Sequence, residues 1–260
     1  MAFANLRSVR LHYELAGAED APVVVFSNSL GADLSMWNAQ MAAFSRRYRV
    51  LRYDTRGHGE SSLPTGFHNL PALAGDVLDL LDYLTIPVAS FCGLSLGGMT
   101  GVWLGSHAPQ RIRKVIACSS AAQIGTQETW NTRIDLVRRE GMAALVPGIL
   151  ERWFTPPFHA NSPAVVAAMR QVLENVSVDG YVAGCSAVRD ADLREELSTV
   201  NVPTLVISGT SDPVTPPADG RFLAAQIPRA RYAEFPGAHL FNLESATSFS
   251  AEVLGFLDTP

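Results

Sequence analysis

The sequence predicts an α/β fold, built around a mostly parallel β-sheet that carries helices on both faces. Short β-rich runs alternate with stretches whose apolar residues recur at helical spacing, and this alternation predicts the sheet and its helices. The run at residues 23–27 is apolar without alternation, as in a strand buried on both sides. Between residues 118 and 204 the alternation stops and only helical patterns remain, which predicts a helical insertion.

The expected elements follow from these patterns in chain order. Strands at residues 9–14 and 23–27 flank a turn at 17–22, and a third strand lies at 48–53. Apolar residues at helical spacing predict a helix at 73–84. The remaining expected elements are a strand at 88–92, a helix at 95–106, strands at 113–118, 204–208 and 231–235, and a closing helix at 246–257.

The insertion contains three helical patterns, at residues 132–140, 142–154 and 163–176. Breaks are expected at Pro147, at Pro156-Pro157 and at Gly180, since proline and glycine interrupt helices. The chain is therefore expected to divide into an α/β core, residues 1–119 and 187–260, and a helical cap, residues 120–186.

Composition narrows the class of protein. The 260 residues are 47% hydrophobic and 17% charged, which favours a large buried core over disorder. The net charge of −5 gives no basic surface for nucleic acid, and no metal-ligand spacing occurs among the six histidines. No stretch approaches the ~18 apolar residues of a membrane span. We expect no nucleic-acid partner, no membrane association and no metal.

The three cysteines indicate the compartment. Cys92, Cys118 and Cys185 lie in apolar contexts and cannot all pair, as expected for buried thiols in a reducing environment. The first residues do not form a basic segment followed by a long apolar run, so no signal peptide is expected. The expected location is the cytoplasm.

A glycine-flanked serine marks the candidate nucleophile. Gly93-Leu94-Ser95-Leu96-Gly97 fits the pattern G-x-S-x-G, with an apolar strand before it and a helix directly after it. Such a tight strand-to-helix turn strains the serine backbone and lifts its hydroxyl above the sheet. The competing interpretation is an ordinary serine at a helix N-cap.

A serine nucleophile needs a base and an acid that orients the base. In this architecture they follow later strands, in the order serine, acid, histidine. Asp212 lies just beyond the strand at 204–208, and His239 just beyond the strand at 231–235. Since open α/β sheets carry their sites at the carboxyl ends of strands, we expect these side chains to meet Ser95. His58 precedes the serine and has the wrong order; residues 54–62 are interpreted as a structural loop with local bonds.

Acyl transfer also needs donors aimed at the developing oxyanion. One expected donor is the backbone N–H of Leu96, directly after the serine. The other is the backbone N–H of Leu30, in the loop after the strand at 23–27. Asn28-Ser29 stands in this loop where a His-Gly pair is common, and a backbone donor tolerates that change.

These residues resemble the α/β-hydrolase superfamily over essentially the whole chain. Within it the chain resembles the 3-oxoadipate enol-lactonases of the β-ketoadipate pathway, which degrades aromatic compounds. The segments that carry the resemblance are residues 27–31, 53–59, 92–99, 151–155 and 181–193. The serine turn at residues 93–97 and the Gly57-His58-Gly59 loop support only the superfamily, because many families share them. The Asn28-Ser29 loop and the segment after Cys185 are more discriminating.

The resemblance implies an eight-stranded, mostly parallel sheet with an inserted cap, and an enzyme that opens a small enol-lactone bearing a carboxylate. It implies no cofactor and a small-molecule lactone as substrate, and it leaves the oligomeric state open. For the substrate carboxylate we expect Arg133, with Trp130 against the ring, because residues three apart share a helix face. Four arginines compete for this role: Arg138, Arg139, Arg152 and Arg189. Trp153 is expected in the core of the cap.

Other functions share these features. A carboxylesterase, a carbon–carbon bond hydrolase and a cofactor-free haloperoxidase would all use the same triad. A haloalkane dehalogenase is disfavoured, since it requires aspartate where this chain has Ser95. A ligand receptor on the same fold would show slow turnover or none, although the complete set of serine, acid and histidine argues against it.

Overall fold

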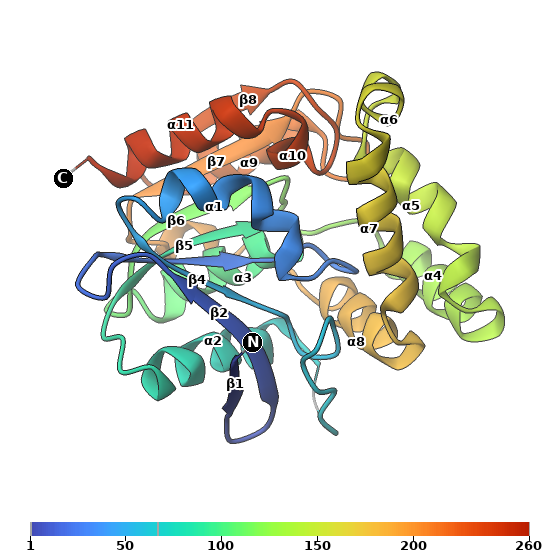
Figure 1. The fold of residues 1–260 in the computed structure, drawn as a ribbon, viewed down its shortest axis with the longest axis horizontal. Coiled ribbons are helices and arrows are strands. Elements are labelled where there is room, and N and C mark those ends of the chain that lie inside the picture. The colour runs from blue at the N-terminus through green and yellow to red at the C-terminus, as the bar shows by residue number, and fades with distance from the viewer. Residues whose placement is uncertain (1, 67, 260) are drawn as a thin grey trace.

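The computed structural model describes residues 2–66 and 68–259, which form one sheet, its flanking helices and a helical insertion (Figure 1). The sheet has eight strands in the order β1-β2-β4-β3-β5-β6-β7-β8. Strands β3 to β8 are parallel, while β1 and β2 join antiparallel at one edge. The predicted fold class is therefore confirmed.

The strands match the sequence prediction except at the N-terminus. Their bounds are β1 Ala2–Asn5, β2 Arg10–Ala16, β3 Val23–Ser27, β4 Arg49–Tyr53, β5 Ala89–Leu94, β6 Ile112–Cys118, β7 Thr204–Gly209 and β8 Arg231–Phe235. No strand was expected over Ala2–Asn5, because four residues are too few to show a period. Pairing with β2, from Ala2 opposite Tyr13 to Asn5 opposite Arg10, defines β1.

Helices of the core lie on both faces of the sheet. Helices α1 (Asn38–Phe44) and α11 (Ala246–Leu257) pack together on one face, and α2 (Leu70–Tyr83), α3 (Leu96–His107) and α9 (Pro217–Gln226) lie on the other (Figure 1). The short helix α10 (Phe241–Glu244) precedes α11, and three 3-10 turns lie at Leu34–Trp37, Met142–Ala144 and Leu197–Thr199. Helices α1 and α9 were not predicted.

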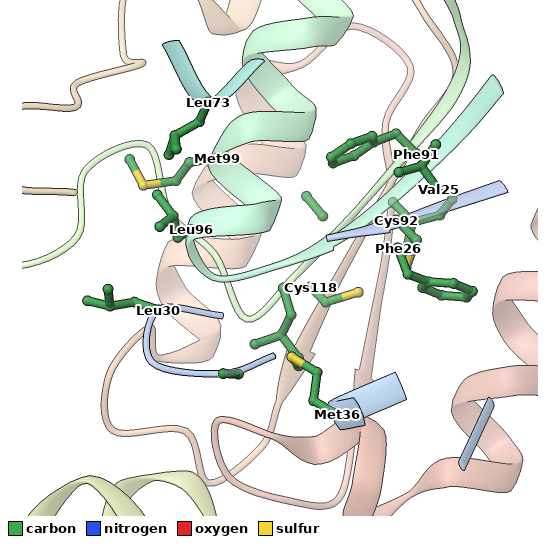
Figure 2. Close-up of a cluster of buried hydrophobic side chains, with 14 of the residues drawn as sticks. Val25, Phe26, Leu30, Met36, Leu73, Phe91, Cys92, Leu96, Met99 and Cys118 are labelled. Carbon is green, nitrogen blue, oxygen red and sulfur yellow. The ribbon is translucent and has the colours of Figure 1, made fainter. Parts of the chain in front are cut away.

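The core lies on both faces of the central strands: Phe91 of β5 packs against α3, whereas Phe26 of β3 contacts Trp37 and Phe44 on the face that carries α1. Val25, Phe26, Phe91 and Cys92 are fully buried on β3 and β5, and Met99 of α3 belongs to the same cluster (Figure 2). This packing fixes the junction between β5 and α3, which carries Ser95.

Five helices follow β6 and precede β7 along the chain. They lie together beyond one side of the sheet (Figure 1). Their bounds are α4 Gln127–Glu140, α5 Val146–Trp153, α6 Pro156–Asn161, α7 Pro163–Asn175 and α8 Val178–Arg189. The pattern at 142–154 is a 3-10 turn followed by α5, not one helix.

Two helices of the insertion were missed. Pro156 and Pro157 were taken as a break, but they occupy the first turn of α6, where a missing N–H costs nothing. Gly180 was also taken as a break, yet it lies inside α8, and the expected boundary at residue 186 falls within that helix. Among the described residues, no helix combines the length and the apolar character that crossing a membrane requires.

Candidate active site

Ser95 occupies a strained turn between β5 and α3. Its φ of 59° and ψ of −113° lie outside the regions that side-chain-bearing residues normally adopt. The side chain forms no capping hydrogen bond, which rules out the ordinary N-cap interpretation. The backbone is held instead, since the Ser95 amide donates to Cys118 at 2.8 Å and its carbonyl accepts from Ser120 Oγ at 3.0 Å.

Two flanking glycines make this turn possible. A Cβ on Gly93 would lie 2.0 Å from the carbonyl oxygen of Gly97, and a Cβ on Gly97 would lie 2.4 Å from that of Ser27. No larger residue fits at either position without moving backbone. The sequence pattern therefore reflects close approach of three backbone segments below the serine.

The predicted acid and base are brought together. His239 Nδ1 donates to Asp212 Oδ2 at 2.8 Å, and both side chains are buried. The same carboxylate accepts from the Val214 amide at 2.8 Å and from the Thr215 hydroxyl at 2.8 Å. Every group that these bonds bring to the Asp212 carboxylate is a hydrogen-bond donor. The bonds hold the carboxylate in place, and the carboxylate in turn holds the imidazole of His239.

The donors around Asp212 also set its protonation. Burial by itself raises the pKa of the carboxyl, but the charge and hydrogen bond of His239 and the bonds from Thr215 and Val214 outweigh burial and lower the pKa below its ordinary value. Asp212 is therefore ionised at neutral pH, as an orienting acid has to be.

The loop after β3 is fixed by Asn28. Its side-chain amide donates to the Tyr53 carbonyl at 2.9 Å, and its side-chain oxygen accepts from Trp37 Nε1 at 3.0 Å. The backbone carbonyl of Asn28 accepts from the Gly97 amide at 3.2 Å, which joins the loop to the first turn of α3. Among described residues, none accepts a hydrogen bond from the amides of Leu30 and Leu96, as expected of two free oxyanion donors.

A small cavity of about 30 Å³ lies between the core and the cap. Ser95, His239, Ser29 and Leu30 line it from the core. The insertion between β6 and β7 contributes eight residues: Ile124, Trp130, Arg133, Ile149, Arg152, Trp153, Tyr181 and Val188. Two larger hollows, of about 760 and 740 Å³, contain none of the predicted triad residues. Ser95 and His239 therefore share the smaller cavity between the core and the cap.

Two arginines face this cavity without a carboxylate partner among the described residues. The Arg133 guanidinium lies over the Trp130 ring, 5.2 Å from its centroid, and donates to the Tyr181 hydroxyl at 3.4 Å. For Arg152, burial first and then repulsion from Arg133 lower the pKa of the guanidinium. Two unpaired cations in one partly buried wall favour an anionic ligand.

The other competing arginines lie elsewhere. Arg139 pairs with Glu140, Arg189 pairs with Asp190, and Arg138 lines the hollow of about 760 Å³ instead. Of the four competitors only Arg152 joins Arg133. The sequence could not single out Arg152, because the direction in which its side chain points depends on how α5 packs against the rest of the cap.

For two further expectations the structure adds contacts that the sequence did not predict. Trp153 is buried in the cap as expected, but it also lines the cavity. The loop at 54–62 has both local and distant bonds: Asp54 accepts from the Glu60 amide at 3.0 Å within the loop and from His12 Nδ1 at 2.7 Å outside it, while Arg56 pairs with Asp76 of α2. The buried His58 does not line the cavity.

Comparisons with known proteins agree with this architecture. The sequence model of the alpha/beta hydrolase fold matches residues 22–246. The chain is 43% identical to 3-oxoadipate enol-lactonase 2 of Acinetobacter baylyi over 247 residues, covering 95% of this chain and 92% of that protein. It is 40% identical to 3-oxoadipate enol-lactonase 1 of the same organism, covering 97% and 95%.

A solved structure extends the likeness to three dimensions. The enol-lactonase from Burkholderia xenovorans LB400 superposes with a TM-score of 0.98 and 46% sequence identity, covering 99% of this chain and 100% of that one. Together with the serine turn, the Asp212–His239 pair and the eight-stranded sheet, these matches place the chain in the family of α/β-hydrolase fold proteins.

Proposed function

We propose that this protein is a 3-oxoadipate enol-lactonase, a serine hydrolase that opens a small lactone bearing a carboxylate. One observation carries the proposal: the cavity that contains Ser95 and His239 also contains two unpaired arginines, in a chain similar to enol-lactonases along nearly its full length. A neutral ester gives no reason for two cations in this wall.

The proposed reaction begins at Ser95. His239 takes the proton of the serine hydroxyl while Asp212 holds the imidazole in the correct tautomer. The hydroxyl attacks the lactone carbonyl, and the amides of Leu30 and Leu96 stabilise the oxyanion, at about 3 kcal/mol for each donor. The bond to the ring oxygen then breaks.

The leaving group makes this chemistry easy. Ring opening releases an enolate, which departs readily and becomes a ketone after proton transfer, so His239 has less acid work than in amide hydrolysis. Water activated by His239 then hydrolyses the acyl-enzyme and gives a dicarboxylate. The proposed roles of Arg133 and Trp130 are to hold the substrate carboxylate and the ring, and Arg152 supplies a second cation beside Arg133.

The free thiols of all three cysteines support a reducing compartment, which we propose is the cytoplasm.

The function is tested by following the ultraviolet absorbance of the enol-lactone. We expect kcat/KM for this lactone to exceed kcat/KM for p-nitrophenyl acetate by at least two orders of magnitude, the range that well-placed binding groups supply (about 10²-fold). Comparable values for the two substrates would leave a general esterase.

The catalytic residue is tested separately with an organophosphonate probe. Wild-type protein should be labelled at Ser95, and Ser95→Ala should not be labelled. An unlabelled wild type with no turnover would favour the receptor interpretation.

A further inference from the structure

The loop that carries His239 is fastened to the cap as well as to the core. On the core side, the Ser211 amide donates to the Gly237 carbonyl at 2.9 Å, beside Asp212. On the cap side, the His239 amide donates to the Arg152 carbonyl at 3.3 Å, and the Leu240 amide donates to the Trp153 carbonyl at 3.0 Å. The base therefore sits between two structural units.

The cap contacts use groups that α5 leaves free. Helix α5 ends at Trp153, and the carbonyls of the last turn of a helix have no partner inside it. Two of these carbonyls accept from the histidine loop, while the side chains of the same residues, Arg152 and Trp153, line the cavity. One turn of the cap thus faces the ligand with its side chains and holds the base with its backbone.

Glu244 ties these parts together. Its carboxylate accepts from the Ala238 amide at 2.8 Å, directly before His239. It also accepts from the Thr155 amide at 3.2 Å and from the Thr155 hydroxyl at 2.5 Å, just after the end of α5. Glu244 lies on α10, so a single side chain of the core binds both the histidine loop and the cap.

The backbone around Glu244 is shaped for this contact. Gly237 has a φ of +139°, and a Cβ there would lie 2.8 Å from the Phe241 Cβ and 3.2 Å from the Glu244 Cβ. The absence of a side chain at Gly237 lets the loop lie directly on α10. The amides of Ala238 and Thr155 donate charge-assisted hydrogen bonds to the Glu244 carboxylate, which joins the loop to the residue after α5.

We propose that Glu244 is a positioning residue for the base: it fastens α5 of the cap to the His239 loop, so that the part of the cap facing the substrate also sets the place of the imidazole. The proposal rests on the proposed hydrolase function of Ser95 and His239, but not on which ester or lactone is the substrate. Glu244 itself does not line the cavity.

The main variant is Glu244→Ala. We expect kcat for the enol-lactone to fall roughly 10- to 100-fold, with KM changed less than about twofold, because a displaced base slows the chemistry without removing binding groups. Labelling of Ser95 by the organophosphonate should slow in parallel, since that reaction needs the same base.

Three comparisons separate positioning from general loss of structure. Glu244→Gln keeps one oxygen that accepts from backbone amides, so it should recover part of the loss. Thr155→Val removes the hydroxyl that donates to Glu244 and that also accepts from the Phe158 amide at the start of α6, and its effect on kcat should be non-additive with Glu244→Ala. Glu252→Ala is the matched control, because Glu252 is also half-buried and bound, here to Arg231, but lies on α11 away from the site; its kcat should equal that of the wild type.

The outcomes are distinct. A folded Glu244→Ala protein with wild-type kcat and wild-type labelling overturns the proposal, and so does an equal loss in Glu252→Ala. If Glu244→Ala does not fold, Glu244→Gln and Thr155→Val decide alone: unchanged kcat in both overturns it. If the wild type is labelled but does not open the enol-lactone, the proposed substrate fails, whereas slower labelling of the Glu244 variants still supports the positioning role.

Discussion

At the scale of single residues, the site is distinguished by charges that the protein leaves unpaired. Asp212 and His239 satisfy each other, and Asp54 is bound by three donors. Arg133 and Arg152, in contrast, have no anionic partner among the residues described and share one wall of the cavity. Buried cations are costly unless paired, so their counter-charge is expected from the substrate.

The two arginines lead to a prediction about KM. Arg133→Leu and Arg152→Leu should each raise KM for the charged lactone about 10- to 100-fold, since hydrogen bonds to charged groups contribute about 1.5–3 kcal/mol. For neutral p-nitrophenyl acetate, KM should change little. Steady-state kinetics with both substrates measures this.

Arg138→Leu serves as the control, because Arg138 lines a different hollow. An arginine whose loss raises KM equally for the charged and the neutral substrate does not bind the carboxylate.

At the scale of elements, α8 connects the cap to the core through close backbone contact. A Cβ on Gly180 would lie 2.0 Å from the carbonyl oxygen of Gly57, whose own φ is +75°. A Cβ on Gly184 would meet Leu30 Cδ1 at 2.4 Å. Helix α8 therefore rests on two core loops, and one of them is the loop expected to supply an oxyanion donor.

This contact predicts opposite effects for two glycine substitutions in helices. Gly180→Ala should lower the free energy of unfolding by about 1–3 kcal/mol, because the obstacle is backbone and helix α8 has to move. Gly75→Ala in α2, where no atom lies within 4 Å of the added Cβ, should raise it by roughly 0.5–1 kcal/mol. Urea unfolding of both variants measures the difference, and shifts of the same sign would contradict this account of the α8 contact.

At the scale of the whole molecule, the cap and the core meet around the cavity that Ser95 and His239 line, and α8 is the cap helix that rests on the core loops. A local separation of α8 from the core would expose thiols that are buried in the structure. The cysteines report on such motion, since Cys92 and Cys118 lie on central strands of the sheet and Cys185 lies on α8, all three fully buried.

The thiols give a prediction that depends on pH. Burial raises the pKa of Cys185 to about 12, against the opposing charges of Arg133 and Arg189, and burial also raises the pKa of Cys92. Because only the thiolate reacts and a raised pKa keeps the thiol protonated, the native protein should react with a disulfide reagent very slowly at about pH 8.

Urea should release all three thiols together with global unfolding. Labelling of Cys185 alone, before unfolding, would show that α8 leaves the core in the native state. Rapid labelling of Cys92 in native protein would contradict the buried sheet.

Much of the fold was accessible from local patterns. The strands from β2 to β8 and the helices α2, α3 and α11 follow from period, composition and turn residues, which are properties of short segments. Strand β1 and helices α1, α6, α8 and α9 were missed. They are short or contain proline or glycine, and packing against the rest of the molecule outweighs their weak local signals.

The candidate site divides in the same way. Ser95, Asp212 and His239 could be named from the sequence because each follows a recognisable strand, and parallel strands bring their carboxyl ends to one edge; their catalytic roles stay a prediction. Arg152 could not be chosen over Arg138 or Arg189 from the sequence, since its position depends on how the cap helices are turned. The two partners of the Asn28 side chain, Tyr53 and Trp37, could not be predicted either, because their positions depend on how the loop packs in the core.

The sequence by itself determined the succession of strands β2 to β8, the helices α2, α3 and α11, the place of the insertion and the residue types at the rim, because these depend on the periodicity and turn chemistry of neighbouring residues. Tertiary structure alone decided which arginines face the cavity and how narrow the cavity is. It also decided that Glu244 binds Thr155, 89 positions away along the chain. Such contacts join segments that have no local preference for each other, and only the packed core holds them at bonding distance.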